Sequence, residues 1–204
     1  MKFLSFGITL FVASNCAAQN NYRNQIELNS LSYRGWISSD SYWEIYKPQG
    51  ISYTRIDSGF NLKFSANYVN YSGVKDGSHC YDCYYGPESL RGLELKSGVQ
   101  KIYGKKKWNL IMGMDLVYGI TRVREDYQGG FSGGGFRSDT KYISFGVNPY
   151  LGAGFNLNKR WQLKLESGCS YRNIQSEDRV NLFKNNFMDF MLLPIQCLGI
   201  GFKF

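Results

Sequence analysis

The chain ends on Leu198-Gly-Ile-Gly-Phe-Lys-Phe204, in which large apolar residues alternate with glycine and lysine. Successive side chains of a β-strand point to opposite faces, so an extended backbone separates these two sets of residues. One face then carries Leu198, Ile200, Phe202 and Phe204, and the other carries Cys197, Gly199, Gly201 and Lys203. The stretch therefore predicts a terminal strand with one apolar face and one face of small or charged residues.

The first residues have the features of a secretion signal. Lys2 supplies the positive end, residues 3–12 form an apolar run, and Cys16-Ala17-Ala18 provides the small residues of a cleavage site. We expect a signal peptide at 1–18 and one mature domain at 19–204 that begins with Gln19. Lipidation of Cys16 is the alternative. After the signal, no stretch approaches the roughly 20 apolar residues that a membrane-spanning helix needs.

The composition indicates a β-rich exported protein. The 204 residues include 16 Tyr, 14 Phe and 23 Gly, with only 4 Pro. The formal charge is +8, and loss of Lys2 with the signal lowers it by one. The only dense basic run is Lys105-Lys106-Lys107, which falls in a short expected turn. So small a run does not form a nucleic-acid surface, and we expect no nucleic-acid partner.

Two-residue periodicity recurs along the mature chain and predicts eight strands. They cover 25–36, 50–57, 61–72, 91–103, 108–124, 140–157, 161–174 and 188–204. The connectors alternate between short, at 57–61, 104–107 and 158–160, and long, at 37–49, 73–90, 125–139 and 175–187. This pattern predicts an all-β fold, an eight-stranded antiparallel up-and-down transmembrane β-barrel with short periplasmic turns and long extracellular loops.

Glycine decides which face of the strands lies inside. In the segment 108–124, Gly113 and Gly119 share the polar face with Asp115. Glycine weakens a solvated strand, but inside a narrow barrel it makes room for larger neighbours. The polar face is therefore expected to line the lumen, and buried charges there must be paired. The predicted lumen charge network consists of Glu94, Lys96, Asp115, Lys164, Glu166 and Arg172. A lumen filled by side chains excludes a wide pore and leaves a narrow ion path as an alternative.

Aromatic residues on the apolar face gather at the strand ends next to the short turns. Amphipathic rings favour the boundary between hydrocarbon and water. The predicted interfacial girdle consists of Tyr103, Trp108, Phe155, Trp161 and Phe204.

The cysteines give one candidate site of chemistry, His79-Cys80-Tyr81-Asp82-Cys83 in an expected loop. Cys80 and Cys83 fit a local disulfide in an exported protein, while free thiols, a metal half-site and catalysis are the alternatives. Cys169 and Cys197 fall on opposite faces of neighbouring strands, so we expect both to be free.

The chain resembles the small outer-membrane β-barrel family typical of Bacteroidota, whose architecture is related to the membrane domain of OmpA. The residues that carry the resemblance are Ala17-Ala18-Gln19, the hairpin from Asn148-Pro149-Tyr150 to Arg160-Trp161, and Gly201-Phe202-Lys203-Phe204. The resemblance implies insertion by the barrel-assembly machinery, which reads a terminal aromatic strand. It implies no defined ligand.

We therefore expect a non-enzymatic, monomeric barrel in the outer membrane of a Gram-negative bacterium, without a cofactor or a metal. It would contact outer-membrane lipid and lipopolysaccharide and serve a structural or surface-binding role through its loops. A narrow channel for ions or small solutes is the first alternative. A lipid-modifying enzyme is the second, and it would depend on His79, the only histidine.

Overall fold

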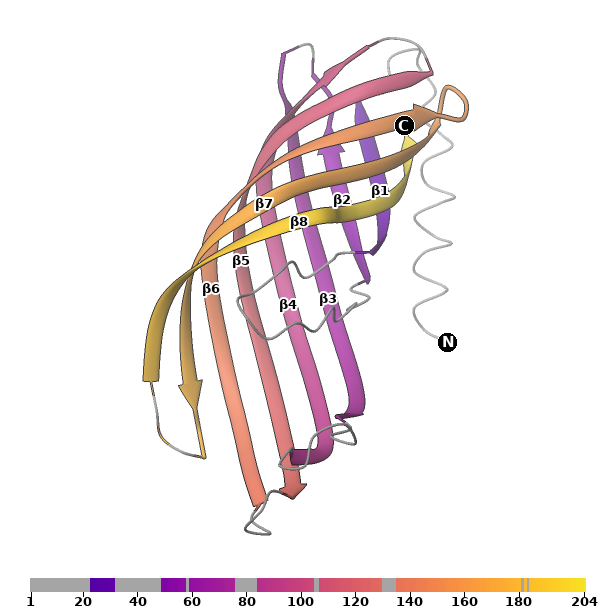
Figure 1. Ribbon diagram of the computed structural model, residues 1–204. Helices are drawn as coiled ribbons and strands as arrows, with labels where there is room; N and C mark the ends of the chain where they lie inside the picture. Colours follow the sequence, from indigo (N-terminus) through magenta and orange to yellow (C-terminus); the bar gives the residue numbers. More distant parts are fainter. Residues whose placement is uncertain are drawn as a thin grey trace.

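A computed structural model of the chain describes residues 23–31, 49–57, 59–75, 84–104, 107–129, 135–180, 182 and 184–204. These residues form eight strands (Figure 1). In chain order the strands are β1 (Asn24–Leu31), β2 (Gln49–Arg55), β3 (Asn61–Lys75), β4 (Tyr84–Tyr103), β5 (Trp108–Gly129), β6 (Gly135–Asn156), β7 (Trp161–Asp178) and β8 (Lys184–Lys203). Within the described ranges the chain forms no helix long and apolar enough to cross a membrane.

Each strand pairs in antiparallel fashion with its neighbours in sequence, and β8 returns to pair with β1. At this seam Ile26 lies opposite Phe202, and Leu28 lies opposite Ile200. The backbone amides of Asn24 and Phe204 also donate hydrogen bonds to each other's carbonyl oxygens. The sheet is thus a closed barrel, which confirms the predicted eight-stranded antiparallel fold.

Short turns join the strands at the end of the barrel where the C-terminus lies (Figure 1). In the β4–β5 turn Gly104 has φ of 108°, a left-handed conformation that glycine adopts without a steric cost. In the β6–β7 turn Asn158 Oδ1 accepts hydrogen bonds from the backbone amides of Arg160 and Trp161, each at 2.8 Å. These local features explain why the β4–β5 and β6–β7 connectors were readable from the sequence.

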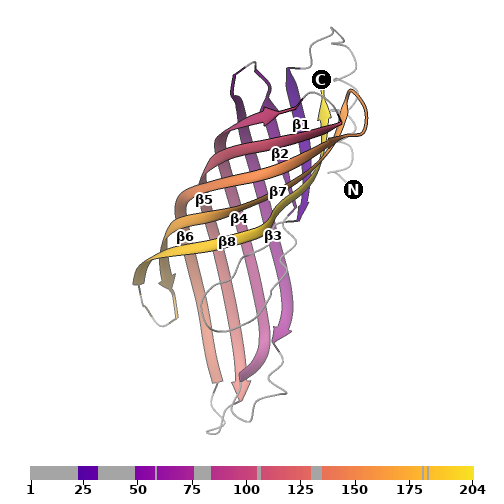
Figure 2. The same cartoon turned by 45° about the horizontal axis from the view of Figure 1, so that its top comes forward.

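At the opposite end the predicted connectors 73–90, 125–139 and 175–187 were too long. There β3 continues to Lys75, β4 starts at Tyr84, and β5 and β6 reach Gly129 and Gly135. Figures 1 and 2 show β3–β6 extending well past the described parts of β1 and β2. Toward this end the outward positions hold polar residues such as Arg122, Arg124 and Asp139, so no hydrophobic period marks the strands although their backbones still pair. Residues 32–36 of the first predicted strand lie outside the described residues.

The two faces of the wall differ in chemistry. Outward side chains at the middle of the strands are mostly large and apolar, and this band of the outer surface is here called the apolar belt. Several of them are about half exposed, among them Leu62, Phe64, Leu95, Met114 and Leu116. The inward positions between them hold Lys63, Lys96 and Asp115, each less than 9% exposed. Polar and charged residues therefore form much of the core of this fold, and apolar residues cover its outside.

Candidate functional site in the barrel lumen

The centre of the lumen holds a group of four ionised side chains from β1, β3 and β7, here called the central network: Glu27, Lys63, Lys164 and Glu166. Lys63 Nζ lies 3.0 Å from both carboxylate oxygens of Glu166. Lys164 Nζ lies 2.7 Å from Glu166 Oε1 and 3.2 Å from Glu27 Oε1. Each of these side chains is at most 4% exposed, so the charges compensate one another away from water.

Amide and phenol groups surround the central network. Gln25 Nε2 donates to Glu27 Oε1 at 3.0 Å and to Gln162 Oε1 at 3.1 Å. Gln100 Oε1 accepts from Lys164 Nζ and from the Tyr150 hydroxyl, both at 3.2 Å. Lys63 Nζ also lies 4.5 Å from the centre of the Tyr150 ring. These contacts fix the orientation of the charged groups, and they leave the lumen crossed by side chains.

A second group of charges lies on the inner faces of β4 and β7. Glu94 Oε1 is 2.9 Å from Lys96 Nζ, and Glu94 Oε2 is 2.7 Å from Arg172 Nη1. Arg172 Nε donates to Ser170 Oγ at 2.6 Å. The carboxylate of Glu94 therefore binds two cations, Lys96 on its own strand and Arg172 on β7, through its two different oxygens.

The six charges singled out from the sequence thus all lie in the lumen, but in two ion-pair groups. Lys164 and Glu166 belong to the central network, and Asp115 Oδ2 approaches it at 3.7 Å from Lys63 Nζ. Glu94, Lys96 and Arg172 form the second group, and among the described residues no ion pair joins it to the central network or to Asp115.

Sequence reasoning missed Glu27 and Lys63, although a signal for both was present. Lys63 stands between Leu62 and Phe64, and Glu27 stands between Ile26 and Leu28. Alternation with apolar neighbours assigns both side chains to the lumen. Their pairing partners were less accessible, because Lys63 on β3 meets Glu166 on β7 only once the barrel has closed.

Glycine supplies the space for these large inward side chains. A Cβ on Gly113 would collide with the Tyr150 ring, which lies opposite it on β6. A Cβ on Gly98 would lie 2.7 Å from the Cα of Asp115 and would also collide with the backbone oxygen of Met114. The glycines therefore keep the wall thin where the lumen is most crowded.

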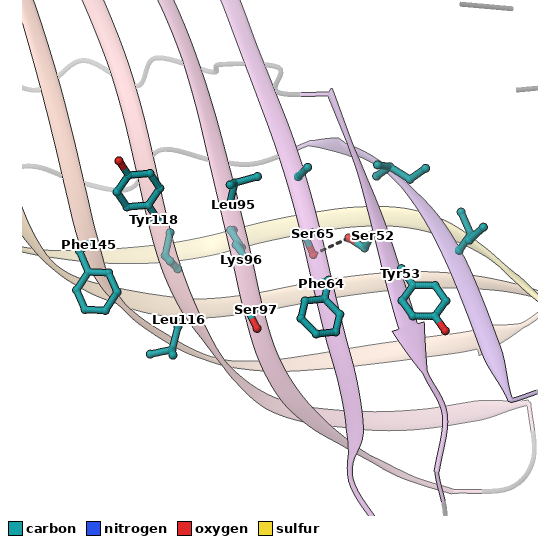
Figure 3. A pocket seen from close by; sticks show the side chains of 14 residues that line it. Ser52, Tyr53, Phe64, Ser65, Leu95, Lys96, Ser97, Leu116, Tyr118 and Phe145 are labelled. Carbon is teal, nitrogen blue, oxygen red and sulfur yellow. Dashed lines mark hydrogen bonds between the residues drawn. The ribbon is translucent and has the colours of Figure 1, made fainter. Parts of the chain in front are cut away.

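The outer surface carries a hollow of about 570 Å³ over β1–β6. Figure 3 shows Phe64, Leu95, Leu116, Tyr118 and Phe145 around it. Ala66 and Ser97 have small side chains within the same lining. Most of the lining belongs to the apolar outside of the barrel, and inward-facing residues such as Ser52, Ser65 and Lys96 contribute the rest.

The aromatic residues of the predicted girdle lie near the short-turn end. Trp108 packs on Phe155 with ring centres 4.7 Å apart, and Trp161 packs on Phe202 at 5.0 Å. Lys101 Nζ lies 5.3 Å from the centre of the Tyr103 ring. Phe204 follows the last strand at the same end and pairs through its backbone with Asn24.

The cysteines and the candidate metal site give a mixed result. Cys80, Cys83 and His79 lie outside the described residues, so the loop disulfide stays a prediction. Cys169 and Cys197 are both free, as their opposite faces predicted, and Cys197 is buried in the lumen. In the described part of the chain, no three His, Cys, Asp or Glu side chains are grouped as a metal site requires.

Solved structures with a similar fold were found by comparison. The NMR structure of outer membrane protein W from E. coli superposes with a TM-score of 0.50 at 12% identity, over 92% of this chain and 100% of that one. Ail, the attachment invasion locus protein of Yersinia pestis, was solved in complex with the heparin analogue sucrose octasulfate. It gives a TM-score of 0.45 at 10% identity, over 89% of this chain and 97% of that one.

No family model and no curated protein sequence matches the chain. The likeness therefore lies in structure, and it shows that the chain has the fold of the small eight-stranded outer-membrane β-barrels.

Proposed function

We propose that the protein is a non-enzymatic barrel that spans the outer membrane of a Gram-negative bacterium. The observation that carries this proposal is the inverted distribution of side chains, with half-exposed Leu and Phe outside and paired charges inside. A water-soluble barrel gains stability from the opposite arrangement. In lipid, the apolar outside costs nothing, and a closed barrel leaves no strand edge unpaired.

The rest of the assignment extends this proposal. The signal at 1–18 would export the chain, the barrel-assembly machinery would insert it, and the barrel would be a monomer. The girdle of Tyr103, Trp108, Phe155, Trp161 and Phe204 would mark the periplasmic boundary of the hydrocarbon. The affiliation with Bacteroidota remains a prediction from the sequence.

A polar substitution in the middle of the apolar belt tests whether this surface meets lipid. Leu116→Arg is expected to cost about 2–4 kcal/mol of folding free energy in a bilayer, because it places a cation in hydrocarbon. The chain is first recovered from the outer-membrane fraction and then unfolded with urea in lipid vesicles. The folded fraction is read on a gel, where folded and unfolded chains migrate differently. Leu182→Arg, in the β7–β8 connector where Leu182 is 84% exposed, is the matched control and should change stability by less than about 0.5 kcal/mol. Equal effects of the two substitutions, or recovery of the chain in the soluble fraction, would contradict the proposal.

The role that fits the filled lumen is structural or surface-binding, with recognition at the far ends of the long hairpins. Shortening the β3–β4 and β5–β6 hairpins beyond the apolar belt should abolish surface binding while the barrel still folds. The alternative enzyme reading depends on His79, which lies outside the described residues.

A narrow channel is the second candidate, and the inward charges are the observation that favours it. The central network crosses the lumen with contacts of 2.7–3.2 Å, so we expect no steady conductance in planar bilayers. Recordings on the purified full chain decide between the two readings. Discrete, reproducible conductance steps would replace the filled-barrel proposal with the channel.

A further inference from the structure

Three cations lie side by side on the outward face of β4, β5 and β6. Arg91 is directly opposite Arg122, and Arg122 is directly opposite Lys141. Neighbouring strands are about 4.8 Å apart, and like charges placed opposite each other destabilise a sheet. An arrangement of this kind needs compensating negative charge close by.

The row lies at the edge of the apolar belt. One outward position closer to the short turns, the same strands carry Leu93, Ile120 and Ile143, which are again in register. A membrane-spanning strand needs about 9–11 residues, and the distance along β4 from the girdle residue Tyr103 to Arg91 just exceeds this length. The cations therefore begin where the outer boundary of the hydrocarbon is expected.

The described carboxylates on this face do not balance the cations. Asp139 accepts hydrogen bonds from Nε and Nη2 of Arg122, the former at 2.6 Å, and its Oδ2 lies 3.5 Å from Arg124 Nε. The hydrogen bonds from Arg122 hold the pKa of Asp139 below its usual range, so this carboxylate stays charged. Asp126 pairs with Arg137 at 3.6 Å.

Glu177 lies opposite Lys141 on β7 but pairs with Lys184 at 3.3 Å. The outward positions of these strand ends, here called the basic ridge, thus carry twice as many cations as carboxylates. The cations are Arg91, Arg122, Arg124, Arg137, Lys141 and Lys184, and the carboxylates are Asp126, Asp139 and Glu177.

We propose that the basic ridge binds the phosphate groups of phosphorylated glycolipids in the outer leaflet, with Arg91 and Lys141 as the principal contacts on either side of the Arg122–Asp139 pair. The proposal rests on the membrane assignment above and names the lipid chemistry that this part of the wall selects. Arg91 offers a planar fork of donors to phosphate oxygens, and Lys141 offers a compact charge.

The position of the ridge favours a lipid over a soluble anion. A lipid phosphate is attached to acyl chains, and these would lie against Leu93, Ile120 and Ile143 on the same strands. One molecule can therefore satisfy both the charged row and the apolar row beneath it. A free anion would gain nothing from the apolar row.

The test uses the folded full-length chain in non-ionic detergent, titrated calorimetrically with bis-phosphorylated lipid A in the same micelles. The double variant Arg91→Gln/Lys141→Gln is expected to bind about 30-fold more weakly, since each cation near a charged lipid surface contributes about 1 kcal/mol. Lys101→Gln/Lys159→Gln removes the same net charge at the short-turn end and should bind like the unaltered chain. Dephosphorylated lipid A should bind equally weakly to all three.

The outcomes separate this proposal from the membrane assignment. Equal losses in the two double variants, or unchanged binding after dephosphorylation, would overturn the phosphate site while the heat-modifiable barrel remained. A variant that has lost heat-modifiability is replaced by the single changes Arg91→Gln and Lys141→Gln, for which the same comparison applies. Failure of the unaltered chain to enter membranes would overturn the membrane assignment itself.

Discussion

Replacing Glu166 by alanine is expected to lower the free energy of unfolding by about 3–5 kcal/mol, because it leaves buried ammonium groups without their counter-ion. Glu166 contacts Lys63 Nζ at 3.0 Å and Lys164 Nζ at 2.7 Å, and all three side chains are almost inaccessible to water. Unfolding of the chain in vesicles by urea, followed on a gel through the folded and unfolded mobilities, measures the loss.

The matched control is Glu177→Ala, which breaks the exposed ion pair with Lys184. Exposed pairs contribute about 0–1 kcal/mol, so this variant should resemble the unaltered chain. Adding Lys63→Met to Glu166→Ala should recover part of the stability, since it removes one of the uncompensated charges. A loss below about 1 kcal/mol in Glu166→Ala would show that the central network is open to water, and the filled lumen would have to be abandoned.

The second large effect is expected from Gly98→Ala. The added methyl group meets the backbone of β5 at Met114 and Asp115, with Cβ 2.7 Å from the Asp115 Cα, and backbone cannot move aside as a flexible side chain can. Overpacking of this kind costs about 1–3 kcal/mol or more. The yield of heat-modifiable barrel and its urea midpoint both measure the effect.

Gly59 provides the comparison because nothing lies within 4 Å of a Cβ built on it. Gly59→Ala in the β2–β3 turn should leave the midpoint unchanged within about 0.5 kcal/mol. If both alanines behave alike, the close contact between β4 and β5 is not what requires glycine at position 98.

The order of the strands and the chemistry of their two faces could be predicted because lipid and lumen impose opposite demands on alternate residues. That demand is visible in single strands such as the one with Lys63 between Leu62 and Phe64. The alternation of apolar and polar residues stops where the strands leave the hydrocarbon. Consequently the outer ends of β5 and β6, residues 125–129 and 135–139, were assigned to a connector.

Other features depend on the register of strands far apart in sequence, which periodicity does not encode. The meeting of Lys63 with Glu166 requires β3 and β7 to face each other across the lumen. The pairing of β7 with β8 also shifts between Glu166 and Gly168, where Cys197 and Leu193 are their partners. Pro194, which cannot donate a backbone hydrogen bond, lies within this irregular stretch and gives it a physical cause.

The seam between β1 and β8 has a kinetic consequence. The first strand finds its second partner only when the last residues of the chain, from Leu198 to Phe204, have arrived. Until then β1 presents a free edge that can pair with other chains, and contacts between such distant segments form slowly. The time until Asn24 and Phe204 meet is therefore an interval of exposure. A chain that lacks the terminal strand should remain in this vulnerable state and aggregate rather than fold to a smaller barrel.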